Sequence, residues 1–329
     1  MLLLALLCGC STPRIAELTM PQGMQAGTAF TLPSSSPLAE AALPQVAGLE
    51  RIDFHGIPAL RLRSAQASAV VSLFGGQVLS FVPNGGEDVL WLSPRTELPP
   101  KPIRGGVPVL WPYMARQGQT PDMPAHGFVR DREWMLQDAR HEGDELVVSL
   151  APASLGDTPL RLRMTLRLGR GLQQELHSEN IGDTPVRFTQ ALHNYFRVGD
   201  AMQARIHGLD GARFLDKNEN YATVHVQRGD WSLQAEGMQG RSDRLYAGDG
   251  HRHELRDPVL QRKIVLRSTG SRSVVVWNPG EQGAAKMPDI GPGWRDFICL
   301  ETTNAGPDVI ELAPGESHVL RQQITVEPL

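Results

Sequence analysis

The stretch Leu160-Arg-Leu-Arg-Met-Thr-Leu-Arg-Leu168 places an apolar side chain at every even position and a polar one at every odd position. This is the period of a β-strand with one buried and one solvent-facing side. Short apolar runs between turn residues predict further strands over 68–73, 77–82, 89–92, 146–150, 186–192, 263–267, 273–277, 297–302 and 318–326. The chain is rich in turn formers, with 33 Gly and 25 Pro, and helical periodicity is nearly absent. We therefore predict an all-β fold, a large antiparallel β-sandwich with few short helices.

The composition narrows the functional classes. The chain has 329 residues, of which 41% are hydrophobic and 21% charged, as in ordinary globular proteins. Its formal net charge of -4 argues against a protein that binds nucleic acid by neutralising phosphates. Two of its three cysteines lie in the first ten residues, which excludes a disulfide framework and a cysteine-rich metal site. No segment approaches the roughly 20 apolar residues of a membrane span.

The N-terminal 13 residues, MLLLALLCGCSTP, allow two interpretations. The LCGC stretch at 7–10 looks like a bacterial lipoprotein cleavage box with Cys10 as the lipidated residue, or the gene start is placed too far upstream. The apolar run is short and no Lys or Arg precedes it, unlike an export signal. We expect a cytoplasmic protein, with a membrane-anchored periplasmic lipoprotein as the alternative. Residues 14–48 are rich in Ala, Pro, Ser and Thr and predict a loosely structured arm or tether, followed by one β-sandwich domain over 49–329.

Four short segments combine ionisable side chains with aromatic and glycine neighbours: IRGGVP at 103–108, AHGFVR at 125–130, ALHNYF at 191–196 and FICLE at 297–301. Glu301 follows four apolar residues, so its carboxyl group is expected at a sheet face or in a cleft, where desolvation raises a pKa. A histidine in such a strand is often a hydrogen-bonded core residue, and that alternative stays open. The His-x-His spacing at 251–253 lies in a polar segment, and we expect no metal there.

In this order the segments resemble the aldose 1-epimerase superfamily, and within it the hexose-6-phosphate mutarotases, also called glucose-6-phosphate 1-epimerases. The resemblance covers roughly residues 50–326. It is carried by RGGVPVLWP, PAHGFVR, LHNYF and ICLETTNA, with support from VWNP at 276–279 and LAPGESHVL at 312–320. It implies a galactose mutarotase-like supersandwich and an isomerase that exchanges the α and β anomers of a hexose 6-phosphate, glucose 6-phosphate first, without a metal or cofactor.

The resemblance also implies roles for single residues. His193 falls on the family's general acid and Glu301 on its general base. His126 falls on a second histidine that contacts the sugar. The remaining positions are implied to bind the substrate. Asp243 would hold the sugar hydroxyls, Arg104 and Arg130 would bind the phosphate, and Gln77 would line the same cleft.

Several of these assignments have structural alternatives. Either arginine could pair with an acidic neighbour such as Asp131 or Glu133 instead of a phosphate. Sugar sites usually add an aromatic platform, for which the candidates are Trp111, Tyr195 and Phe196, with core packing as the alternative. The chain departs from the family pattern at two places. Residues 113–116 are Tyr-Met-Ala-Arg, where many relatives have an aromatic residue followed by Gly. Residue 194 is Asn, where relatives commonly have Thr.

The implied residue types suit the reaction. Opening a sugar ring requires a base that takes the C1 hydroxyl proton and an acid that protonates the ring oxygen, and a carboxyl group with a histidine can do both near neutral pH. Two other functions remain open: an epimerase for unphosphorylated sugars such as galactose or glucose, and a non-catalytic carbohydrate-binding sandwich. A pure binder has no need of an acid/base pair. We expect a monomer whose partner is a small sugar phosphate.

Overall fold

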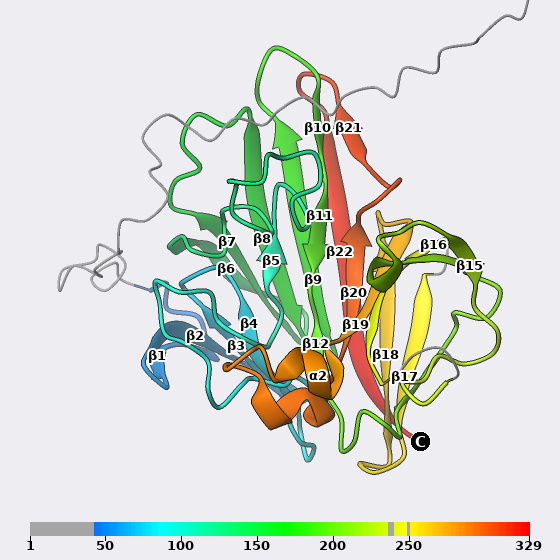
Figure 1. Ribbon diagram of the computed structural model, residues 1–329. Coiled ribbons are helices and arrows are strands. Elements are labelled where there is room, and N and C mark those ends of the chain that lie inside the picture. Colours follow the sequence, from blue (N-terminus) through cyan, green and yellow to red (C-terminus); the bar gives the residue numbers. More distant parts are fainter. Residues whose placement is uncertain (1–42, 236–239, 249–250) are drawn as a thin grey trace, which may run out of the picture.

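The computed structural model describes residues 43–235, 240–248 and 251–329. These residues are built almost wholly from antiparallel strands, which confirms the predicted all-β fold (Figure 1). Helix within the described ranges is limited to three short elements: η1 (Lys217–Glu219), α2 (Gly280–Ala284) and η2 (Gly291–Asp296). None of these is long and apolar enough to cross a membrane. The first 13 residues with Cys10, and the arm as far as residue 42, lie outside the described residues.

The alternating stretch forms β8 (Leu160–Leu168), near the middle of a large antiparallel sheet. Its apolar side chains are buried, while Arg161 and Arg163 are exposed, as the pattern predicts. The sheet runs in the order β13-β17-β18-β22-β9-β8-β7-β6. The bounds of its other strands are β6 (Trp134–Glu142), β7 (Glu145–Pro152), β9 (Leu172–Asn180), β13 (Arg205–His207), β17 (Arg252–Asp257), β18 (Arg262–Thr269) and β22 (Ser317–Pro328).

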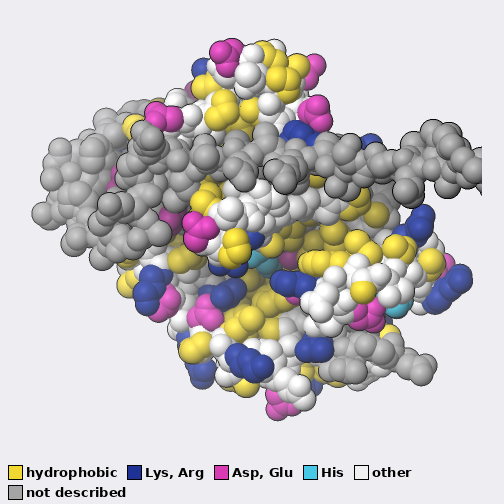
Figure 2. Space-filling model, turned by 45° about the horizontal axis from the view of Figure 1, so that its top comes forward, with side chains coloured by type: hydrophobic (Ala, Val, Ile, Leu, Met, Phe, Trp, Pro, Cys, Tyr) yellow, Lys and Arg dark blue, Asp and Glu magenta, His cyan; other side chains and the backbone are white. Residues whose placement is uncertain are grey.

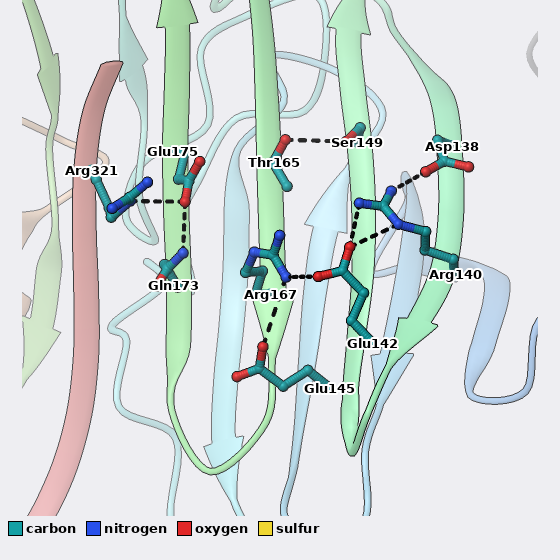
Figure 3. A network of polar contacts seen from close by, with 10 residues as sticks. All are labelled: Asp138, Arg140, Glu142, Glu145, Ser149, Thr165, Arg167, Gln173, Glu175 and Arg321. Atoms are coloured by element: carbon teal, nitrogen blue, oxygen red, sulfur yellow. Dashed lines mark hydrogen bonds and ion pairs between the residues drawn. The ribbon is translucent and has the colours of Figure 1, made fainter.

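The polar face of this sheet carries a ladder of charged pairs (Figure 3). Arg167 of β8 bonds Glu142 of β6, which also bonds Arg140. One strand further, Glu175 of β9 accepts a hydrogen bond from Arg321 of β22 at 2.8 Å. Because these pairs are solvent-exposed, each contributes little to stability, about 0–1 kcal/mol. Their main effect is to keep this face polar.

A second large sheet packs its inner face against the first and carries the candidate site. Its order is β15-β14-β16-β19-β20-β11-β5, and β12 also pairs with β20. One continuous core joins the sheets, with Leu162 and Leu176 from the first and Leu192 and Leu300 from the second. The strand bounds are β5 (Val109–Leu110), β11 (Gln190–Leu192), β12 (Tyr195–Arg197), β14 (Arg213–Asp216), β15 (Val224–Val226), β16 (Ser242–Ala247), β19 (Ser273–Asn278) and β20 (Phe297–Asn304).

Two smaller antiparallel sheets complete the described fold. One is a meander of four strands in the order β1-β2-β3-β4, namely β1 (Leu49–Phe54), β2 (Ile57–Arg63), β3 (Ala67–Ser72) and β4 (Val78–Pro83). It lies beside the edge strand β6 (Figure 1). The other pairs β10 (Val186–Phe188) with β21 (Ile310–Leu312).

The structure differs from the sequence prediction in two of the predicted segments and in several strands that were not predicted, among them β1, β2, β6, β16 and β17. Residues 89–92 form only isolated bridges at Leu90 and Leu92, not a strand. Residues 186–192 divide into β10 and β11, because the chain leaves the partner β21 and turns to β20 at Thr189. The strand β9 was not predicted, since it alternates Leu with buried Gln174, Ser178 and Asn180. Those polar side chains are hydrogen-bonded inside the protein, which removes the cost of burying them and hides the strand's pattern.

A pair of buried amides joins the two sheets behind the site. The side chains of Asn194 and Gln322 exchange hydrogen bonds at 2.9 and 2.8 Å. Asn194 also donates to the carbonyl of Leu300 at 2.9 Å. One side chain therefore ties the backbone beside His193 to the backbone beside Glu301.

Candidate active site

A cavity of about 880 Å³ opens over the second sheet. Its floor is formed by β12, β16, β19 and β20, and its walls by the 102–130 region, the 215–221 segment and the residues around Asp289. Figure 2 shows a hollow in this face with Lys and Arg side chains around its edge and a histidine within it. The volume lies within the range of about 300–1,000 Å³ that is usual for small-molecule sites.

Glu301 stands on the cavity floor because of the period of β20. On this strand Ile298 and Leu300 point into the main core, whereas Cys299 and Glu301 point to the opposite side. Only 1% of Glu301 is exposed. The carboxyl group is thus both desolvated and directed into the cavity, as the sequence pattern predicts.

His193 lies in the short connection between β11 and β12, directly beside that carboxyl group. Its Nε2 is 3.4 Å from Oε1 of Glu301. Its ring stacks on Tyr195, with centroids 4.8 Å apart and planes 7° apart. Among the described residues, His193 Nδ1 and Glu301 Oε2 are buried without a hydrogen-bond partner. A buried polar group without a hydrogen-bond partner is costly. Both atoms therefore have unused hydrogen-bonding capacity that a bound ligand could satisfy.

Both groups favour their neutral forms. Burial lowers the pKa of His193 well below its usual range, and the charges of Arg104 and Arg130 act in the same direction. Burial raises the pKa of Glu301 well above its usual range, and the nearby Asp243 raises it further. Both shifts act against a charged pair and favour the arrangement in which one proton is shared between a neutral imidazole and the carboxyl group.

His126 is fixed by its own backbone in the opposite wall. Its N–H donates to the carbonyl of Ala115 at 2.6 Å, and the Ala115 N–H donates to His126 Nδ1 at 3.1 Å. Because Nδ1 accepts, the neutral ring carries its proton on Nε2. Burial, then Arg130 and other nearby cations, lower the pKa of His126 to about 3. The ring is therefore a neutral donor, and its centroid is 6.3 Å from that of His193.

The AHGF segment needs a glycine at its third position for a steric reason. Gly127 has φ +75°, and a Cβ there would lie 1.8 Å from the carbonyl oxygen of Trp111. Only glycine permits this approach. The contact sets the backbone course that brings His126 and Arg130 to the cavity wall.

The two predicted arginines line the cavity but differ in their partners. Arg104 donates from Nε to Asp289 at 2.6 Å and from Nη1 to the hydroxyl of Tyr195 at 3.0 Å. Arg130 donates to the carbonyl of Ala125 at 2.8 Å, and its Nε is buried without a partner in the described chain. The acidic partner of Arg104 is thus Asp289, and neither Asp131 nor Glu133.

Asp243 reaches the cavity from β16, as the resemblance implied. Its Oδ2 is 3.3 Å from Nζ of Lys217 in η1, and both residues line the cavity. Burial raises the pKa of Asp243, while Lys217 opposes that shift. Asp243 and Lys217 together set part of the field at Glu301, since the first raises and the second lowers its pKa.

Gln77 and Trp111 lie outside the cavity lining, contrary to the sequence analysis. Gln77 is buried beneath the wall, where its amide donates to the carbonyls of Ile103 and Gly105 at 3.3 and 2.5 Å. Trp111 is a core residue whose indole N–H donates to Ser178 at 3.0 Å. Gln77 therefore supports the backbone on either side of Arg104. Phe196 is likewise part of the core.

Of the three aromatic-platform candidates of the sequence analysis, Tyr195 lines the cavity. The cavity also contains residues that the sequence analysis did not single out as candidates. Among them are the aromatic residues Trp277 and Tyr221, and Tyr221 is 44% exposed with φ +59°, rare for a side chain of its size. Asp289, Lys217 and Arg116 are also in the lining. Their segments match no motif, and only the fold brings them together. In the described part of the chain, no group of three or more His, Cys, Asp or Glu residues could hold a metal ion.

Comparisons with known proteins found a matching family and several similar proteins. The model of a family described as aldose 1-epimerase matches residues 58–325. A protein of Escherichia coli K12 named "Putative glucose-6-phosphate 1-epimerase" is 33% identical over 252 residues, which cover 73% of this chain and 81% of that protein. A protein of Cenchrus ciliaris with the same name is 28% identical, with 85% of each chain covered. The crystal structure of a "putative mutarotase" from Salmonella typhimurium superposes with a TM-score of 0.76 at 28% identity, covering 87% of this chain and 96% of that one.

Proposed function

The chain belongs to the aldose 1-epimerase family and is therefore an epimerase, and we propose that it interconverts the α and β anomers of a hexose 6-phosphate, glucose 6-phosphate above all. The observation that carries the proposal is the pair His193 and Glu301, 3.4 Å apart on the floor of a cavity with cationic walls. The names of the relatives support the phosphorylated substrate.

The pair suits ring opening and reclosure. One group takes the proton from the C1 hydroxyl while the other protonates the ring oxygen, so that the C1–O bond of the ring breaks and an aldehyde forms. After rotation about C1–C2 the two transfers run in reverse and close the ring on the other face. The family resemblance makes His193 the acid and Glu301 the base. The pKa shifts favour the proton on Glu301 in the free site, and the assignment then requires its transfer to His193 when the sugar binds.

The other lining residues suit the rest of the sugar. His126 offers a neutral Nε2 donor to a ring hydroxyl, and Asp243 offers a carboxyl group to hydroxyls further along the ring. Trp277 and Tyr221 supply aromatic surface for its apolar face. The walls also carry four cations, Arg104, Arg116, Arg130 and Lys217, which favour an anionic substrate. We place the activity in the cytoplasm because hexose phosphates are cytoplasmic metabolites.

Anomer exchange measured on glucose 6-phosphate, free glucose and free galactose tests the proposal. We expect exchange well above the spontaneous rate, with the largest kcat/KM for the phosphate. A preference for free galactose would favour the unphosphorylated-sugar epimerase. Binding without exchange of any of the three sugars would indicate a carbohydrate-binding protein and overturn the proposal.

A further inference from the structure

The geometry of the His193–Glu301 pair needs a support other than side-chain hydrogen bonds. In the described part of the chain, no other side chain hydrogen-bonds to the imidazole or to the carboxyl group. Many acid/base sites orient the histidine through a third side chain that binds its second ring nitrogen. Here the ring is held by stacking on Tyr195 and by the backbone that carries it. The separation of the pair therefore depends on how the two backbone segments are joined.

The side chain of Asn194 joins these two segments. Asn194 directly follows His193, and Leu300 directly precedes Glu301. Nδ2 of Asn194 donates to the carbonyl of Leu300 at 2.9 Å, so this bond spans the same gap as the acid/base pair. The other Nδ2 hydrogen bond goes to Oε1 of Gln322 at 2.9 Å, and Oδ1 accepts from Nε2 of Gln322 at 2.8 Å. Both donors and the acceptor of the Asn194 amide are thus in use.

Gln322 anchors Asn194 to the opposite sheet. It lies on β22 of the first sheet, 128 positions from Asn194 in the sequence. Its Nε2 also donates to Oε1 of Gln174 on β9 at 3.2 Å, and Gln174 donates to Sδ of Met164 on β8 at 3.1 Å. All four side chains are fully buried, where hydrogen bonds are strong and an unpartnered amide is costly. The backbone after His193 is thereby fixed to the middle strands of the first sheet.

We propose that Asn194, held by Gln322, is a positioning residue that sets the separation between His193 and Glu301. This role rests on the proposed function. Asn194 is fully buried and does not line the cavity, so it has no direct contact with a sugar there. Proton transfer needs heavy-atom distances of about 2.6–3.2 Å, and a misplacement of about 1 Å can cost about a hundredfold in rate. Loss of the Asn194 amide should therefore lower kcat and leave KM nearly unchanged.

Replacing Asn194 tests this split. In Asn194→Leu, kcat on glucose 6-phosphate per folded molecule should fall about tenfold to a hundredfold, with KM within about twofold of the wild type. Asn194→Thr keeps one hydroxyl donor and should show a smaller loss.

Gln190→Leu is the matched control. The Gln190 amide is equally buried and donates to Oδ1 of Asn304 at 3.1 Å, between β11 and β20, the strands that precede His193 and carry Glu301. Its removal leaves a buried acceptor without its donor, so the free energy of unfolding should fall. Because this pair lies away from the acid/base residues, kcat should stay within about twofold of the wild type.

A double substitution separates positioning from stability. Asn194→Leu leaves the buried amide of Gln322 without its main partner and should destabilise the protein. Adding Gln322→Met replaces the second polar group by an apolar one of similar size, so part of the lost stability should return. The bond to Leu300 is still missing, and kcat should stay low. Recovery of kcat in step with stability would show a merely structural role and refute the inference.

Crystal structures of the variants separate this role from the proposed function. In Asn194→Leu the distance from Nε2 of His193 to Oε1 of Glu301 should exceed that of the wild type by about 0.5 Å or more, whereas Gln190→Leu should keep it. A wild type that exchanges no sugar would refute the proposed function, and this distance would still decide whether Asn194 positions the pair. An unchanged distance in Asn194→Leu, or a kcat within about twofold of the wild type, would overturn the inference.

Discussion

Replacing Glu301 by Gln separates chemistry from stability at the centre of the cavity. Glutamine has the same size as glutamic acid and can still accept at Oε1, but it cannot take or give the proton that the carboxyl group holds. A positioned proton transfer typically contributes about 10²–10⁴ in rate. With Oε1 at 3.4 Å from the partner Nε2 of His193, we expect anomer exchange on glucose 6-phosphate to slow at least about a hundredfold.

The same substitution should not weaken the fold. Burial raises the pKa of Glu301 above its ordinary value, so above about pH 4.3 the native state binds more protons here than the unfolded chain. The free energy of unfolding therefore falls as pH rises from that value toward the native pKa, by up to about 1.4 kcal/mol per pH unit. Because a glutamine side chain cannot ionise, the substitution removes this pH-dependent loss of folding stability. The variant should be as stable as the wild type near pH 4 and more stable at neutral pH.

Exchange is followed by polarimetry or NMR, and stability by denaturant unfolding between pH 4 and 8. Glu254→Gln on β17 is the control. Hydrogen bonds from Arg256, and from Arg252, lower the pKa of Glu254 to about 2, so its stabilisation is present above its ordinary pKa and is lost as pH falls toward 2. That variant should lose stability at neutral pH and keep full exchange. Near wild-type exchange in Glu301→Gln would refute the role of Glu301.

Three further substitutions test neighbouring parts of the site. His193→Asn should slow exchange at least about a hundredfold with the fold intact by circular dichroism, and a smaller loss would remove His193 from the acid/base pair. Lys217→Met removes a cation that lowers the pKa of Glu301. The limb of the pH–rate profile that reports the ionisation of Glu301 should therefore move to higher pH. A shift of that limb to lower pH would contradict the effect of Lys217 on Glu301. Trp111→Phe leaves the buried hydroxyl of Ser178 without its donor. It should lower the free energy of unfolding by about 1–3 kcal/mol in denaturant while anomer exchange is retained. A loss of exchange without a loss of stability would instead indicate that Trp111 contacts the substrate.

The fold class could be predicted from the sequence because the alternation of apolar and polar residues is a local property, whereas the roles of the candidate site residues came from the family resemblance. Period-2 alternation records which side of a strand is buried, and β8 has the bounds that its pattern predicts. The apolar run before Glu301 likewise predicted a desolvated carboxyl group. The pattern failed at β9, whose buried polar side chains find hydrogen-bond partners on other strands. No local pattern records such partners.

The composition of the cavity, by contrast, depends on contacts between distant segments. Gln77 and Trp111 belong to segments near the cavity, yet their side chains point into the wall and the core. Asp289 reaches Arg104 from 185 positions away and changes that arginine from a free cation into a paired one. The sequence by itself determined the all-β fold class and the strands with the clearest apolar pattern, and the family resemblance supplied the candidate acid/base residues. Only the tertiary structure decided which charges are compensated, because ion pairing depends on distances of a few ångströms between residues that the chain leaves far apart.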